Sequence, residues 1–245
     1  MTNLPKPLPP PEFSNSPQVE FNRNEFESAV WSKGYEVIRE KAISCPCGTL
    51  GHPDTSCRYC NGVGLLFIDP VLDRVLMTSI NSESKYKEWS MDKSGTVSMT
   101  LRDNTVPISF YDRITIKDCY SYLSENRSLN NDDFVWLTFK PKRILSVHIL
   151  DSLGVPTEVG SDKYSIDLEN PYILVIDPEI NPSNGLISVY YEHEVQYYVI
   201  DIPHDMRSSN VTDANGNLNK IDLPLNVICR RGNQFIGERQ IYGSD

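Results

Sequence analysis

The chain has 245 residues and a net charge of −10, with 33 Asp or Glu against 23 Lys or Arg, which is long enough for one or two domains with a substantial core. The charge argues against a protein whose main task is to grip nucleic acid, because phosphate contacts need clustered Lys and Arg. No apolar run is long enough to cross a bilayer and no signal peptide opens the sequence, so we expect a soluble protein made in the cytosol, with neither a membrane nor a sequence-specific nucleic acid as partner.

Residues 1–20 are rich in proline and contain the run Leu4-Pro5-Lys6-Pro7-Leu8-Pro9-Pro10-Pro11-Glu12-Phe13. Prolines at this density prevent helix and sheet and favour extended polyproline II. The segment is either a disordered tail, as chain ends commonly are, or an extended arm that lies across a neighbouring subunit. In the second case Leu4, Leu8 and Phe13 are the oligomer contacts.

Residues 24–43 are predicted to form a helix. Asn24 and Glu27 have the spacing of a capping pair. Apolar residues then recur at helical spacing, at Phe26, Ala29, Val30 and Val37. Gly34 weakens the middle of this helix, which leads directly into the first cysteine pair.

Four of the six cysteines follow in two close pairs, Cys45 with Cys47 and Cys57 with Cys60. Zn²⁺ prefers four soft ligands in a tetrahedron, and thiolates on closely spaced turns supply them without a large core. The sequence therefore predicts one zinc knuckle with these four cysteines as ligands. A site with all four positions filled is structural, because a catalytic zinc needs an open position.

Two alternatives remain open for this stretch. The first pair has one residue fewer between its cysteines than a standard knuckle, so His52 is a possible substitute ligand. The cysteines could also form disulfides or be four unrelated thiols. Disulfides suit secreted domains, and the sequence gives no sign of secretion.

The rest of the chain is strand-like, with polar turns at the spacing of small antiparallel folds. The strands predicted before residue 124 are 65–68, 73–80, 96–101, 108–110 and 113–116, and they suggest a small β-barrel. A polar segment, 124–133, is the expected seam. The strands predicted after it are 134–139, 144–150, 163–168, 172–176, 186–200 and two or three within 211–242, and they suggest an Ig-like sandwich.

The predicted fold class is therefore mainly β (α+β). Its expected parts are an extended arm (1–20), a helix plus the zinc knuckle (21–68), a β-barrel-like lobe (69–130) and a β-sandwich-like lobe (131–245).

Three stretches contain residue types found in metal or catalytic sites, but none of them predicts an active site. Residues 213–219 resemble a calcium loop but lack its sixth-position glycine and twelfth-position Glu, so a hairpin turn is the better interpretation. Glu192 and Glu194 alternate with His193 along a strand and point away from it. His204 and Asp205 stand at a strand end, but no nucleophile on a Gly-x-Ser-x-Gly elbow accompanies them. We expect no catalytic residues, and we expect His204 to be structural.

The motifs together resemble a structural protein of tailed bacteriophages. Such proteins have a helix leading into Cys-Pro-Cys, then Gly-x-Pro-Asp, then Cys-x-x-Cys-x-Gly-x-Gly, as in residues 45–64 here. Residues 107–116 are similar to the barrel segment of these proteins, and residues 190–207 to their closing strand with its Pro-His-x-x-Arg end.

The resemblance implies a neck or head–tail connector protein (a ring or head-completion component). Such a protein forms a homo-oligomeric ring, commonly dodecameric, and contacts the portal and other neck and tail proteins. It is a virion component assembled in the host cytoplasm, and it is not an enzyme. The alternatives are a β-sandwich module on a phage tail that binds host or glycan, and a hydrolase centred on His204.

Overall fold

The computed structural model describes residues 23–47, 54, 57, 59–60, 62–79, 95–102, 106–129, 133–150, 153, 155–180, 185–203, 208–212, 218–222 and 224–233. The mainly-β class is confirmed, and the strand pairs are antiparallel. No helix in this part of the chain is long and apolar enough to span a membrane. The elements are α1 (Arg23–Lys33), β1 (Tyr35–Ser44), β2 (Leu65–Ser79), β3 (Thr96–Leu101), β4 (Arg113–Ser128), β5 (Phe134–Trp136), β6 (Pro141–Leu150), β7 (Pro156–Glu158), β8 (Tyr164–Ile166), β9 (Ile173–Ile176), β10 (Leu186–Asp201), β11 (Ser208–Thr212), β12 (Leu218–Asp222) and β13 (Asn226–Arg231).

The predicted helix was wrong over its second half, because α1 ends at Lys33 and β1 follows. Gly34 marks the end of the helix, where its N–H donates to the Val30 carbonyl at 2.8 Å. A Cβ at Gly34 would lie 2.3 Å from the Val30 carbonyl oxygen and 3.1 Å from the Val75 carbonyl oxygen, so no larger residue fits. After Gly34, Val37 and Arg39 are both buried. Burial of every second residue is typical of a strand.

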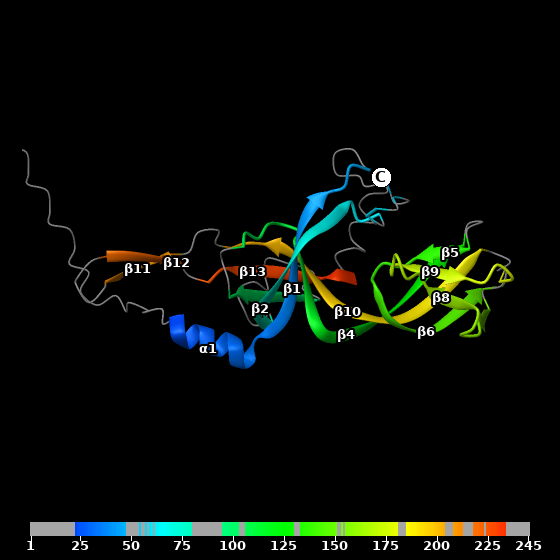
Figure 1. Ribbon diagram of the computed structural model, residues 1–245, viewed down its shortest axis with the longest axis horizontal. Coiled ribbons are helices and arrows are strands. Elements are labelled where there is room, and N and C mark those ends of the chain that lie inside the picture. The colour runs from blue at the N-terminus through cyan, green and yellow to red at the C-terminus, as the bar shows by residue number, and fades with distance from the viewer. Residues whose placement is uncertain are drawn as a thin grey trace, which may run out of the picture.

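Six strands pair in a closed ring, called here the six-strand ring. Their order is β13–β3–β2–β1–β4–β10, and β10 pairs in turn with β13. The ring encloses a core that includes Val37, Val75, Met99, Ile114, Val199 and Val227. Figure 1 shows the ring between α1 and a second body of strands.

The second body is built on extensions of β4 and β10, which have 16 residues each. There β10 pairs with β6, and β6 pairs with β7, while β5, β9 and β8 form a separate sheet. Side chains from both groups of strands form the second core, which includes Val135, Leu137, Val147, Leu174, Ile187 and Tyr191. In Figure 1 the strands β5, β6, β8 and β9 lie on the other side of the six-strand ring from α1. Strands β11 and β12 pair only with each other among the described elements.

Two irregularities shape the long strands. In β2, Asp69 (φ 51°) and Pro70 lie opposite a register shift in β1 between Arg39 and Lys41, so a bulge joins what the sequence suggested were two strands. In β4, the pairing with β10 jumps from Ile116 to Tyr120, and Asp118 has φ 57°. This second bulge lies where β4 passes from the six-strand ring to the second core.

Two further segments differ from the sequence expectation. Residues 108–110 are not a strand; Asp112 holds this segment by accepting the Ser109 N–H at 2.7 Å and the Ala42 N–H at 2.8 Å. Residues 124–128, the first part of the expected seam at 124–133, continue β4 as a strand. Their inward side chains are charged, and Glu125 accepts hydrogen bonds from the Thr138 N–H (2.9 Å), just after β5, and from the Tyr191 hydroxyl (2.8 Å) on the neighbouring strand β10.

Candidate metal centre

The four clustered cysteines lie at one end of the β1–β2 pair. Cys45 and Cys47 directly follow β1, and Cys57 and Cys60 precede β2. Since the two strands are antiparallel, with Ser44 opposite Leu65, the end of one and the start of the other bring the two pairs together. The Cys45 N–H donates to the Gly64 carbonyl at 2.9 Å and closes the junction. Gly64 itself has φ 77°, a conformation that favours glycine.

The sulfur atoms of these four residues lie within 4.8 Å of one another and could hold a metal ion. The distance between Sγ of Cys45 and Sγ of Cys57 is 3.8 Å, and between Sγ of Cys47 and Sγ of Cys60 it is 3.6 Å. A disulfide would require about 2.05 Å. A tetrahedral zinc with Zn–S bonds of about 2.3 Å places its sulfurs about 3.8 Å apart. The residues therefore fit a four-thiolate zinc site.

Burial and local hydrogen bonds perturb the thiols. Cys45, Cys57 and Cys60 are buried, and Cys47 is half-buried. Hydrogen bonding from the Cys60 backbone lowers the pKa of Cys57 to about 7. Burial raises the pKa of Cys60 to about 12 and also raises the pKa of Cys45. Metal binding would replace the thiol protons, so affinity for the metal should increase with pH.

Several other predicted site residues lie outside the described part of the chain. These are the alternative ligand His52, the arm residues Leu4, Leu8 and Phe13, and the pair His204 and Asp205. Their roles stay predictions. The two remaining cysteines, Cys119 on β4 and Cys229 on β13, are free thiols in other strands.

His193 is a core residue. It is 5% exposed, and its ring stacks on Phe139 with the centroids 4.2 Å apart. Its Nδ1 lies 2.7 Å from the Glu194 carbonyl oxygen. Burial lowers the pKa of His193, so the neutral ring is favoured in the folded state. On the other face of β10, Glu192 lies 3.7 Å from Arg143.

The strands on both sides of residues 213–217 pair with each other, and this pairing favours the hairpin interpretation; the turn itself lies outside the described residues. Thr212 of β11 lies opposite Leu218 of β12, and the register continues to Ser208 opposite Asp222. The strands β11 and β12 are therefore antiparallel neighbours.

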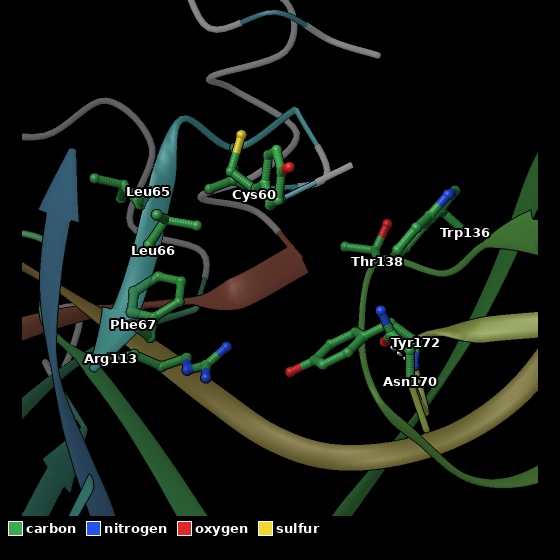
Figure 2. Close-up of a pocket in the computed structure, with 11 residues that line it drawn as sticks. Cys60, Leu65, Leu66, Phe67, Arg113, Trp136, Thr138, Asn170 and Tyr172 are labelled. Carbon is green, nitrogen blue, oxygen red and sulfur yellow. Dashed lines mark hydrogen bonds between the residues drawn. The ribbon is translucent and has the colours of Figure 1, made fainter. Parts of the chain in front are cut away.

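A pocket of about 310 Å³ adjoins the cysteine cluster, and sequence reasoning did not find it. One wall comes from the knuckle, β2 and Arg113, and the other from β5 and the segments that follow β5 and β8 (Figure 2). Its lining includes Tyr59, Phe67, Arg113, Trp136, Asn170 and Tyr172. From the sequence alone, aromatic residues in separate strands are expected to be core residues. Nothing in their sequence spacing indicates that they line one cavity.

The chain matches no known family model and no curated protein. Function is therefore inferred from the cysteine cluster, the pocket and the fold.

Proposed function

We propose that this chain is a non-enzymatic structural component of a tailed-phage virion, a neck or connector ring protein that links portal and tail. The order of its motifs supports the proposal: a four-cysteine knuckle with the phage-type glycine spacing, followed by the segments 107–116 and 190–207. The protein would be assembled in the host cytoplasm, as a homo-oligomeric and commonly dodecameric ring. Its partners would be the portal and other neck and tail proteins.

The observation that carries the proposal is the closed cysteine cluster. Four thiolates within 4.8 Å of one another can fill all four positions of a tetrahedral zinc, which would leave no open position for a substrate or an activated water. Such a metal holds a Gly-rich and Pro-rich segment in place, and structural metal binding contributes directly to folding. We assign zinc this structural role and assign no catalytic residue.

The finer architecture is part of the same proposal. The six-strand ring has the closed pairing of a small β-barrel, and we interpret it as the expected barrel-like lobe. The strands around the second core, two sheets with a shared interior, would be the Ig-like sandwich lobe. The predicted boundary near residue 130 divides these lobes only roughly, because β13 returns to the ring.

Native mass spectrometry of the purified protein, alone and with a candidate portal, tests the proposal. We expect one zinc per chain, a closed ring and a complex of defined stoichiometry with the portal. A monomer that never associates with itself or with portal would remove the connector assignment. A hydrolytic activity that is abolished by His204→Gln would remove the non-enzymatic assignment.

One observation favours the alternative, a recognition module for host or glycan on a phage tail. Tyr120, Tyr122 and Tyr190 are exposed on one face of β4 and β10, and the rings of Tyr122 and Tyr190 lie 6.1 Å apart. The Nζ of Lys142 lies 5.8 Å from the Tyr120 ring. Clustered exposed aromatic rings suit sugar stacking. Glycan-array binding that is lost in Tyr122→Ala would favour this alternative over the connector.

A further inference from the structure

The pocket beside the cysteine cluster is shaped for a short segment of chain. Its volume of about 310 Å³ is at the lower end of ligand pockets, so it takes a few side chains rather than a folded domain. Figure 2 shows Leu66 and Phe67 on one wall, facing Trp136 and Tyr172 on the other. An extended segment lying between the walls would therefore contact rings on both sides.

The pocket is aromatic and nearly neutral. The guanidinium of Arg113 lies over the Phe67 ring, 4.1 Å from its centroid. Glu40 balances this charge by accepting hydrogen bonds from Nε and Nη2 of Arg113 at 2.7 and 2.9 Å. Tyr59, beside the pocket, is 84% exposed. The chemistry favours an occupant without strong net charge and with flat apolar surfaces.

The lining residues also include hydrogen-bond donors. Figure 2 shows the Tyr172 hydroxyl directed toward the opposite wall, and Trp136 and Asn170 have side-chain N–H donors. The Oδ1 of Asn170 accepts the Tyr172 N–H at 3.2 Å and fixes the turn that carries both residues. Aromatic rings interleaved with donors are how proteins bind polyproline II, because its carbonyls have no internal hydrogen-bond partners.

Residues 4–13 of this chain have the matching chemistry. They contain five prolines, including the Pro-x-x-Pro spacing of Pro7 and Pro10, and the charges of Lys6 and Glu12 cancel. We propose that this segment of one subunit docks in the pocket of a neighbouring subunit, with Leu8 and its flanking prolines against Trp136 and Tyr172. The inference rests on the ring assembly proposed above and specifies how the arm binds there.

The acceptor is assigned to a neighbouring subunit because the proposed ring places an identical pocket beside each arm. The same chain reaches its own pocket only by a return path. In Figure 1, α1 leads away from the second core. The arm would have to pass back along α1, about 15 Å long, and along β1 from Tyr35 to Ala42, about 23 Å. The fifteen residue steps from Leu8 to Arg23 extend at most about 54 Å, so chain length allows both acceptors, and crosslinking between differently labelled chains decides between them. An adjacent subunit in a ring avoids this return path.

Photo-crosslinking in the full-length protein tests the docking. The photoreactive residue p-benzoylphenylalanine replaces Leu8, and chains labelled with ¹⁴N and ¹⁵N are mixed before assembly. We expect crosslinks between heavy and light chains, on peptides that contain residues 59–67, 136–138 or 170–172. The same analogue in place of the exposed Leu153 is the control and should not crosslink to these peptides.

A mild pocket variant then separates docking from folding. Tyr172→Phe removes one hydroxyl donor and should lower the crosslink yield roughly three- to tenfold, the effect of one hydrogen bond, with zinc content and melting unchanged. Trp31→Phe, on α1, is the matched control and should leave the yield unchanged.

The outcomes distinguish this inference from the proposed function. Rings that form normally but crosslink elsewhere, or only within one chain, would overturn the docking and leave the connector proposal standing. A protein that is monomeric by sedimentation and does not bind portal would overturn both.

Discussion

Replacing Cys57 with serine should remove the metal and loosen one core while sparing the other. The variant removes one of four ligands from a site that fixes the end of β1 against the start of β2. Val63 and Leu65, just after the cluster, are each 6% exposed and belong to the second core. The core of the six-strand ring, which includes Val37 and Val75, has no member among the described residues of the knuckle.

The expected loss of stability follows from those two side chains. Fully burying a Val or Leu side chain stabilises the fold by about 1.5–3 kcal/mol, so releasing both Val63 and Leu65 costs about 3–6 kcal/mol. The loss falls on the second core and on the ends of β1 and β2. The helix predicted next to the knuckle is not affected directly, because β1 occupies that place.

Metal analysis together with hydrogen exchange measures this effect. The wild type should contain one zinc per chain and Cys57→Ser much less, with faster amide exchange near residues 42–47 and 63–67. Exchange in β3 and β13 should be unchanged. Cys119→Ser, which alters a half-buried thiol far from the cluster in sequence, is the control and should keep its zinc.

Three results would refute the reasoning. Substoichiometric metal in the wild type, or complete titration of its thiols in the native state, would remove the zinc site. Loss of exchange protection spread evenly over both cores would contradict the local role of the cluster. If Cys47→Ser kept the metal while His52→Ala lost it, His52 would be the fourth ligand.

Three other predictions follow from the charges and the arm. Burial lowers the pKa of His193, so the stability of the fold should fall as the pH drops through about 6.5 and the imidazole of the unfolded chain becomes protonated. His193→Gln should flatten the pH dependence of the urea midpoint between about pH 7.5 and 5.5. An unchanged slope would contradict this. Asp73→Ala strands the buried Arg39, 3.0 Å from Asp73, and should cost about 3–5 kcal/mol in chemical denaturation, whereas Glu179→Ala at an exposed ion pair should cost less than about 1 kcal/mol; equal losses would refute the difference. Deleting residues 1–20 should leave melting and zinc content unchanged and block co-sedimentation with portal, and normal incorporation would make the segment an ordinary disordered tail.

The cysteine site was predictable because its signal is local. The two cysteine pairs and the glycines after them define turns around a metal by themselves, and the structure brings the four sulfurs within 4.8 Å. The strands with regular alternation were also predictable, and β3 has the predicted bounds of Thr96–Leu101.

The sequence predictions failed where contacts between residues distant in the sequence determine the local structure. Apolar residues in 24–43 fit a helical spacing, but α1 ends before Gly34, where the Val30 and Val75 carbonyls leave no room for a side chain. The polar stretch 124–133 was expected to be a seam between lobes, yet residues 124–128 continue β4, and Glu125 there accepts hydrogen bonds from Thr138 and Tyr191. The pocket was missed for the same reason, since its walls meet only through long-range pairing.

The bulge at Lys117–Cys119 sets the relation between the two halves of the molecule. On each side of the bulge, side chains of β4 point alternately inward and outward. Residues 117–119 have no residue opposite them on β10, and their number determines which side chains of the following segment face the second core. Removing one of them would invert that parity, turning Ser124 and Asn126 inward and Glu125 and Arg127 outward. Removing two would keep the parity and change only the bend and twist of the strand. The orientation of one half relative to the other is therefore adjustable in steps of two residues, without any change in either interior.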